Sequence, residues 1–245
     1  DEVMKELPPI FYQHVVVEPG PVAIDQDLYF INYVVPKDRT QELYEMLDSQ
    51  RKFIETAIDN RGYAPGYQEE NDMGKILEAL SGSVSSLRRY TGLQKVQAIA
   101  DIIESELSSK AYEKVVIFAV HQGVIEGLRS RLAKHGVVTL YGKTPAEKRM
   151  QNVDSFQNNK KTRVFIGNIT AAGTAITLTA AHNVVFAECE WVPAMMAQAA
   201  MRCHRIGQKN PVTIRFFSLS NSIDERISEK IKRKTKELTE IFDVQ

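Results

Sequence analysis

The stretch that decides the fold is Val115-Val116-Ile117-Phe118-Ala119-Val120, a run of six apolar residues. A strand that is apolar on both of its sides is buried on both faces of its sheet, which is typical of parallel sheets. The run is flanked by amphipathic stretches at 93–109 and 122–134, where apolar residues recur at helical spacing. Helix, strand and helix in this order predict a parallel sheet that is covered by helices on both faces.

The same alternation continues toward the end of the chain. It predicts strands at 137–141, 163–167, 184–187 and 211–219, helices at 145–157, 194–203 and from 223 onward, and a helix-length segment at 172–181. The predicted fold class is therefore α/β, a doubly wound parallel sheet with helices on both faces. Ligands are expected at the carboxyl ends of its strands.

The first ninety residues have a more irregular pattern. They predict strands at 10–18 and 28–35, a helix at 38–58, a loop at 61–72 and a helix at 73–80 before a Ser/Gly-rich stretch at 81–86. We therefore divide the chain into a mixed and helical N-terminal extension (1–86), an α/β lobe (87–222) and a C-terminal helix (223–245).

The composition is that of a globular protein, with 43% hydrophobic and 25% charged residues in a chain of 245. It excludes collagen-like, disordered and disulfide-stapled classes, and no apolar run is long enough to span a membrane. The chain does not begin with Met and has no apolar signal core, so we interpret it as part of a longer intracellular protein. Cys189 and Cys203 lack metal-ligand spacing, so we predict no metal site and two reduced, buried thiols.

The net charge of zero conceals an uneven distribution. Residues 1–90 hold 9 Lys and Arg against 16 Asp and Glu, whereas residues 91–245 hold 22 against 15. The basic second part is better suited to a polyanionic partner. Two solvated surfaces of different charge are the alternative explanation.

Gly142-Lys143-Thr144 follows a predicted strand and precedes a predicted helix, as a phosphate-binding loop does. That loop needs a glycine five positions before Gly142, but this position holds Val137. Pro145 removes an amide donor and suits the first turn of a helix. The chain therefore does not hold ATP phosphates in the P-loop manner by itself.

The most informative stretch is Gln198-Ala-Ala-Met-Arg202-Cys-His-Arg205-Ile-Gly207-Gln. On the end of a helix, Arg202 and Arg205 would project two guanidinium groups from one face. Two permanent forked cations suit a γ-phosphate, whose charge spreads over three oxygens. Gly207 would let the helix end in a left-handed turn. A surface arginine pair bound to carboxylates remains the alternative at this point.

This stretch resembles motif VI of the Swi/Snf-type ATPases of helicase superfamily two, and the resemblance covers most of the chain. Residues 87–96 resemble the opening of the second RecA-like lobe, 116–121 resemble motif IV, and Tyr141 to Arg149 resemble the Gly-x-Thr…Arg motif. Residues 168–181 resemble motif V, Glu188, Trp191 and Pro193 fit the acidic-x-x-Trp-x-Pro pattern, and 223–227 resemble the brace helix. The ordered set is highly specific.

The resemblance implies the second RecA-like lobe of an ATP-dependent double-stranded DNA translocase. Arg202 and Arg205 would be arginine fingers, and Gln198 and Gly173 would also lie at the nucleotide. ATP and Mg²⁺ would be held mainly by a first RecA-like lobe of the same full-length chain, so this chain alone is expected to be inactive as an ATPase. The resemblance implies DNA-phosphate contacts for His121, Gly142, Lys143, Thr144 and Thr170, because short polar side chains and free amides position a backbone. Capping of a strand end is the equal alternative for His121.

Motif V departs from the family pattern. Thr170, Ala172 and Ala175 replace an arginine and two glycines, which resembles the fork-remodelling, strand-annealing branch. Met201 stands where an acidic residue commonly precedes the first arginine. Two rival functions stay open, a non-catalytic nucleic-acid or protein-binding module and an RNA-dependent superfamily-two ATPase.

Two further features complete the sequence-based expectations. Trp191 is expected in the core rather than stacked on DNA. The basic run Lys230 to Lys236 contacts DNA or the other lobe, or forms a solvated helix face. The expected location is intracellular, in a prokaryotic or phage-infected cell or in a nucleus, with DNA repair or chromatin remodelling as the setting.

Overall fold

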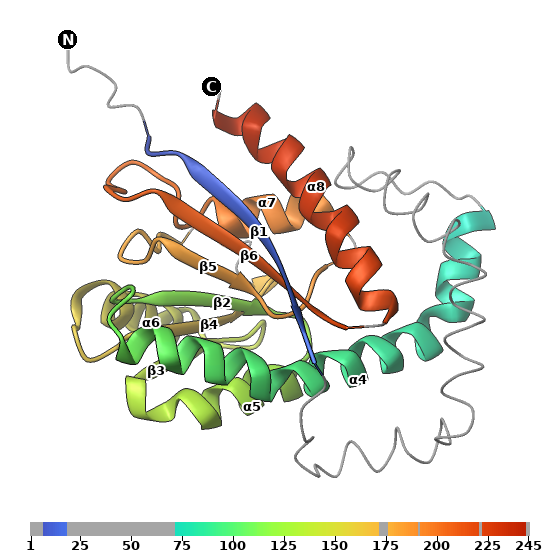
Figure 1. Ribbon diagram of the computed structural model, residues 1–245, viewed down its shortest axis with the longest axis horizontal. Coiled ribbons are helices and arrows are strands. Elements are labelled where there is room, and N and C mark those ends of the chain that lie inside the picture. The colour runs from blue at the N-terminus through green and yellow to red at the C-terminus, as the bar shows by residue number, and fades with distance from the viewer. Residues whose placement is uncertain (1–6, 19–71, 172–175, 191, 221, 244–245) are drawn as a thin grey trace.

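The computed structural model describes residues 7–18, 72–171, 176–190, 192–220 and 222–243 (Figure 1). The strand predicted at 28–35, the helix predicted at 38–58 and nearly all of the loop predicted at 61–72 lie outside the described residues. The same is true of Gly173 and Trp191.

The described residues form one parallel sheet of six strands. In chain order the strands are β1 (Ile10–Val17), β2 (Val115–Ala119), β3 (Val137–Leu140), β4 (Val164–Asn168), β5 (Asn183–Phe186) and β6 (Val212–Leu219). They lie side by side in the order β1-β6-β5-β2-β4-β3, and every neighbouring pair is parallel. The predicted doubly wound α/β class is confirmed.

The helices are α4 (Asp72–Ser108), α5 (Gln122–Leu132), α6 (Ala146–Asn158), α7 (Pro193–Ala200) and α8 (Ile223–Asp243), and a short 3₁₀ helix at Ala133–His135 follows α5. Alternate residues of β2 point to opposite faces of the sheet. Ile117 belongs to a core that includes buried side chains of α4 and α5, whereas Phe118 belongs to a core with side chains of α6, α7 and α8. Figure 1 shows these two groups of helices on opposite sides of the strands.

The N-terminal part of the chain is joined to this sheet directly. Strand β1, predicted as part of the extension, pairs with β6 from Ile10 opposite Val212 to Val17 opposite Leu219. Helix α4 begins at Asp72 and runs through residue 86 without a break. The predicted helix at 73–80 with an interruption at 81–86 is therefore wrong, because Ser and Gly lower helix stability by at most about 1 kcal/mol each and do not forbid a helix. The predicted domain boundaries stay predictions.

Two further segments differ from the prediction. Helix α7 ends at Ala200 rather than at residue 203. The described part of the predicted helix-length segment, 176–181, has no helical residues, because some of its backbone groups bond to distant partners and a single turn joins Ala181 N to Leu178 O. Leu178 N donates to Arg202 O at 2.8 Å, and Ala180 N donates to Gln157 Oε1 at 2.9 Å.

Cys189 and Cys203 are free and buried, as predicted. Burial raises the pKa of Cys189 to about 12 and also raises the pKa of Cys203. Among the helices of the described residues, none combines the length and the apolar character needed to cross a membrane.

Candidate nucleic-acid and nucleotide-binding sites

The residues predicted to contact DNA gather at one edge of the sheet. His121 follows β2, Thr170 follows β4, and Gly142, Lys143 and Thr144 follow β3. Because β2, β4 and β3 are neighbours and parallel, their carboxyl ends lie side by side. Gly142, Lys143 and Thr170 are exposed there, whereas His121 and Thr144 are half-buried.

The loop after β3 is a tight turn rather than a phosphate cradle. Strand β3 occupies 137–140, so no length remains for a P-loop. Thr144 N donates to Tyr141 O at 3.1 Å, and Tyr141 N donates to Thr144 Oγ1 at 2.9 Å. Arg149 of α6 closes the turn by donating to Thr144 O at 2.8 Å and to Gly142 O at 2.6 Å. The turn therefore holds Lys143 outward at the strand ends.

Asn168, which sequence reasoning missed, ties the ends of β2 and β4 together. Its Nδ2 donates to Val120 O at 2.7 Å, and its Oδ1 accepts from Thr170 N at 3.0 Å and Ala171 N at 3.2 Å. Thr170 is thereby fixed in an exposed position beside the end of β2. The available sequence signal was a polar side chain that ends an otherwise apolar strand.

Glu188, just after β5, is buried beside His121. Its Oε2 accepts from Val120 N and from His121 N, both at 2.8 Å, and its Oε1 lies 2.6 Å from His121 Nδ1. Burial acts to raise the pKa of Glu188, but the hydrogen bonds and charge of His121 and the charge of Lys95 outweigh it and hold the pKa below its ordinary value. The side chain of Glu188 is therefore an ionised carboxylate at neutral pH.

A second buried ion pair lies beside the first. Lys95 of α4 is fully buried and donates to Asp224 Oδ2 at 2.7 Å and to Phe217 O at 2.9 Å. Asp224 Oδ2 also accepts from Leu219 N at 3.0 Å. The pair fixes the start of α8 to the end of β6. Sequence reasoning did not single out either residue.

The two arginines lie on turns after α7, not on the helix that was predicted to carry them. Arg202 is half-buried, and Arg205 is exposed. Burial, and then the charge of Arg205, lower the pKa of Arg202. The Arg205 Nη1 makes only long contacts of 3.4 Å to Ile176 O and Thr177 Oγ1. Within the described part of the chain, no carboxylate pairs with Arg205.

Gln208 fixes the segment that carries the arginines. It is buried, its Nε2 donates to Ala181 O at 2.9 Å and to Cys203 O at 3.0 Å, and its Oε1 accepts from two backbone N–H groups. Gly207 has a φ of +101°, so the predicted left-handed turn is present, although beyond the end of the helix. The side chain of Gln198 is exposed on α7.

A groove of about 750 Å³ lies between α6 and the segment that Arg205 contacts. Residues of α6 and Thr144 line it, and so do Ile176 and Thr177, which Arg205 contacts. Among the described residues, the two arginines lie in the segment between α7 and β6, whereas the residues predicted to contact DNA follow β2, β3 and β4.

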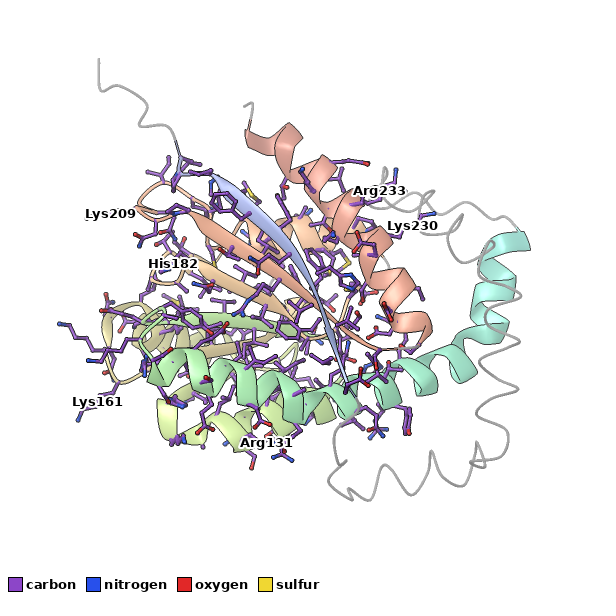
Figure 2. All side chains as sticks on the ribbon, in the orientation of Figure 1. Arg131, Lys161, His182, Lys209, Lys230 and Arg233 are labelled. Carbon is purple, nitrogen blue, oxygen red and sulfur yellow. The ribbon has the colours of Figure 1, made fainter. Side chains whose placement is uncertain are left out.

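The basic run of α8 is largely paired with acids of the same helix. Lys232 lies 2.7 Å from Glu229, and Lys234 lies 3.4 Å from Glu237. Figure 2 shows Lys230 and Arg233 on the outer side of α8, away from the sheet. Arg233 and Lys236 are exposed, whereas Lys230, Lys232 and Lys234 are half-buried, so both interpretations of the run stay predictions.

The donor set of the arginine segment fits a phosphate rather than a metal ion. Two guanidinium groups supply forked donors for anionic oxygens. In the ranges that the structure describes, no group of three His, Cys, Asp or Glu side chains is placed to hold a metal ion.

Comparisons with known proteins show which family the chain resembles in sequence. Residues 94–207 match the family model described as "Helicase conserved C-terminal domain". The chain is 34% identical over 205 residues to a "SWI/SNF-related matrix-associated actin-dependent regulator of chromatin subfamily A-like protein 1 homolog" of Caenorhabditis elegans, covering 82% of this chain and 29% of the relative. It is 32% identical over 160 residues to the "DNA annealing helicase and endonuclease ZRANB3" of Mus musculus, covering 64% of this chain and 15% of the relative.

A solved structure shows the same RecA-like fold. The chain superposes on the "Sulfolobus solfataricus SWI2/SNF2 ATPase core in complex with dsDNA" with a TM-score of 0.59 and 19% identity, covering 99% of this chain and 48% of that one. The chain spans less than a third of the length of the two relatives named above.

Proposed function

Because the chain is the C-terminal lobe of a Swi/Snf-type helicase, we propose that it serves as the second motor lobe of an ATP-dependent double-stranded DNA translocase. A first lobe, expected in the same full-length chain, holds ATP and Mg²⁺. This lobe supplies Arg202 and Arg205 to the γ-phosphate and contacts the DNA backbone with the residues at the ends of β2, β3 and β4. An intracellular or nuclear setting is part of the proposal.

The arrangement of Arg205 carries the nucleotide half of this proposal. An exposed guanidinium that is paired with no described carboxylate favours an anion from outside the lobe. Gln208 fixes the segment that carries the arginines from within the lobe. The segment therefore loses little conformational entropy when the anion binds.

The proposed role of the arginines in ATP hydrolysis follows from the negative charge that develops on the γ-phosphoryl group. As the γ-phosphoryl group leaves, charge spreads over its oxygens, and a fixed guanidinium stabilises that state more than the bound ground state. ATP held by the first lobe would therefore draw the two lobes together, and hydrolysis would release them. In comparable systems an arginine finger is worth roughly 10³- to 10⁵-fold in rate.

The strand-end residues support the DNA half. Lys143 and Thr170 are exposed on adjacent loops, and their ammonium and hydroxyl groups suit phosphate oxygens, contacts that position a duplex without reading its bases. The Sulfolobus solfataricus core that this chain superposes on is described in complex with dsDNA. We therefore favour DNA over RNA as the activating polyanion.

The test uses the full-length enzyme with Arg205→Ala, and Arg129→Ala as the matched control. Arg129 is an exposed arginine on α5 that pairs with Glu126 and lies outside the proposed sites. We expect Arg205→Ala to lower DNA-stimulated ATP hydrolysis by about 10³-fold or more while ATP binding is retained. The control should keep its turnover. In the same phosphate-release assay, the 245-residue chain alone should show no stimulated hydrolysis.

Normal turnover in Arg205→Ala would remove the finger role. Robust turnover by the chain alone would contradict the need for a first lobe. Stimulation by RNA but not by duplex DNA would favour the RNA-dependent rival, and absence of hydrolysis in the full-length protein would favour a non-catalytic binding module.

A further inference from the structure

The two oxygens of Glu188 have different partners, and this fixes the state of His121. Oε2 accepts the backbone N–H groups of Val120 and His121, both at 2.8 Å, whereas Oε1 faces His121 Nδ1 at 2.6 Å. An ionised carboxylate can only accept hydrogen bonds. Nδ1 must therefore carry the hydrogen, and the neutral ring keeps its lone pair at Nε2.

Nε2 of His121 is directed to a ligand or to water. It has no hydrogen-bond partner among the described residues and is not one of the buried polar atoms, and the ring keeps 17% of its surface exposed. A phosphate oxygen is itself an acceptor, so it is repelled by a lone pair at Nε2. Only the doubly protonated ring presents an N–H to phosphate from this nitrogen.

We propose that Glu188 is a positioning residue that accepts a hydrogen bond from His121 Nδ1–H and so keeps this hydrogen turned into the lobe. His121 then contacts a DNA phosphate only as an imidazolium, and duplex affinity depends on pH. The inference rests on the proposed function, because it takes His121 as a DNA contact. It adds that this contact depends on Glu188 and on a second proton on the ring of His121.

The charges around the pair do not supply an alternative partner for His121. Lys95 of α4 and Asp224 of α8 pair with each other at 2.7 Å. Arg88 of α4 donates to the backbone oxygen of Cys189. The end of β4 contributes the neutral Asn168, which bonds to Val120 O.

On the helix that follows His121, the charged groups face elsewhere. Glu126 of α5 accepts from Tyr141 and pairs with Arg129. Glu188 is therefore the carboxylate that holds the ring of His121, through the contact of its Oε1 with Nδ1 at 2.6 Å.

The substitution Glu188→Gln tests the proton placement. The amide oxygen must stay on the two backbone N–H donors, so the amide NH₂ faces Nδ1 and makes it an acceptor. The neutral ring of His121 then carries its hydrogen on Nε2. Long-range ¹H–¹⁵N NMR of the chain should show the Nδ1–H tautomer in the native protein and the Nε2–H tautomer in Glu188→Gln. This measurement needs no DNA.

The second measurement is binding of a short fluorescent duplex at constant ionic strength from about pH 5.5 to 8.5. We expect native affinity at the acidic end of this range to exceed that at the alkaline end by about fivefold or more, because Nε2 donates to phosphate only in the imidazolium form. In His121→Gln this part of the pH dependence should disappear, and in Glu188→Gln it should shrink, because the neutral ring already donates from Nε2. Other histidines contribute equally to all three proteins.

Glu229→Gln is the matched control. Glu229 also pairs with a histidine Nδ1, that of His14 at 2.7 Å, but the other nitrogen of His14 is bonded to Ser218 at 2.7 Å. The same substitution there should leave the pH profile of DNA binding unchanged.

An Nε2–H tautomer in native His121 would overturn the proposal even if DNA binds. A native Nδ1–H tautomer with a pH profile that His121→Gln does not alter would overturn the proton-dependent contact. Failure of the chain to bind duplex at any pH, with the tautomers as expected, would locate the error in the proposed DNA contact rather than in the role of Glu188.

Discussion

Gly92 of α4 lies against Glu188 and Val124 and has no room for a side chain. A Cβ there would lie 2.5 Å from Glu188 Oε1 and 2.9 Å from Val124 Cγ2. Glu188 cannot swing away without cost, because both of its oxygens are held by Val120 and His121. Gly92→Ala therefore forces the buried carboxylate to move and breaks its contact with His121.

The magnitude follows from two opposing effects. Alanine is favoured over glycine inside a helix by about 1 kcal/mol. Overpacking costs about 1–3 kcal/mol, and weakening hydrogen bonds to a buried charge costs about 1.5–3 kcal/mol. We expect Gly92→Ala to lower the free energy of unfolding by about 1.5–5 kcal/mol in total.

Urea unfolding of the chain, followed by circular dichroism, measures this loss. Gly123→Ala is the control, because a Cβ on Gly123 of α5 meets its nearest neighbour, Leu93 Cδ2, at an ordinary 3.5 Å. In a Glu188→Ala background the cost of Gly92→Ala should fall below about 1 kcal/mol, because most of the clash is gone. Equal costs in both backgrounds, or a native-like midpoint for Gly92→Ala, would refute the reasoning.

The remaining predictions concern acid stability and the arginine segment. The pKa of Glu188 lies below the ordinary 4.5, so Glu188 contributes stability that is complete above about pH 4.5 and is lost as pH falls through the lower folded value. Urea titrations should therefore show a steeper loss below pH 4.5 in the native chain than in Glu188→Gln, and parallel slopes would contradict this. Gln208→Ala should lower stability by about 2–4 kcal/mol, because it leaves several backbone groups without a partner. An unchanged thermal midpoint would show that Gln208 does not hold the segment.

The sheet could be predicted because its strands are apolar on both sides. Each of the five strands predicted from residue 115 onward is present within a residue or two at either end. Helix ends were less predictable, since they depend on what the backbone bonds to next. Helix α7 ends at Ala200 because backbone groups of the following residues bond to another segment. Arg202 O, for example, accepts a hydrogen bond from Leu178 N. The pattern of apolar residues carries no information about such a bond.

The candidate site shows a similar limit. Motif resemblance named His121, but the partner that fixes its ring comes from the end of another strand, 67 residues further along the chain. Only the strand order β5-β2-β4 brings Glu188 next to it. A single acidic residue at the end of the apolar run 184–187 was the available signal, because a buried carboxylate needs partners.

The arginines lie apart from the strand-end residues, but a series of hydrogen bonds connects the two sites. The described segment 176–181 donates to Arg202 O through Leu178 N and receives Gln208 at Ala181 O. It also donates, through Ala180 N, to the side-chain oxygen of Gln157 on α6. Helix α6 in turn carries Arg149, which closes the turn that holds Lys143. A shift of the arginine segment on lobe closure would therefore reach the DNA edge through hydrogen bonds between packed elements, which switch between discrete arrangements rather than stretch.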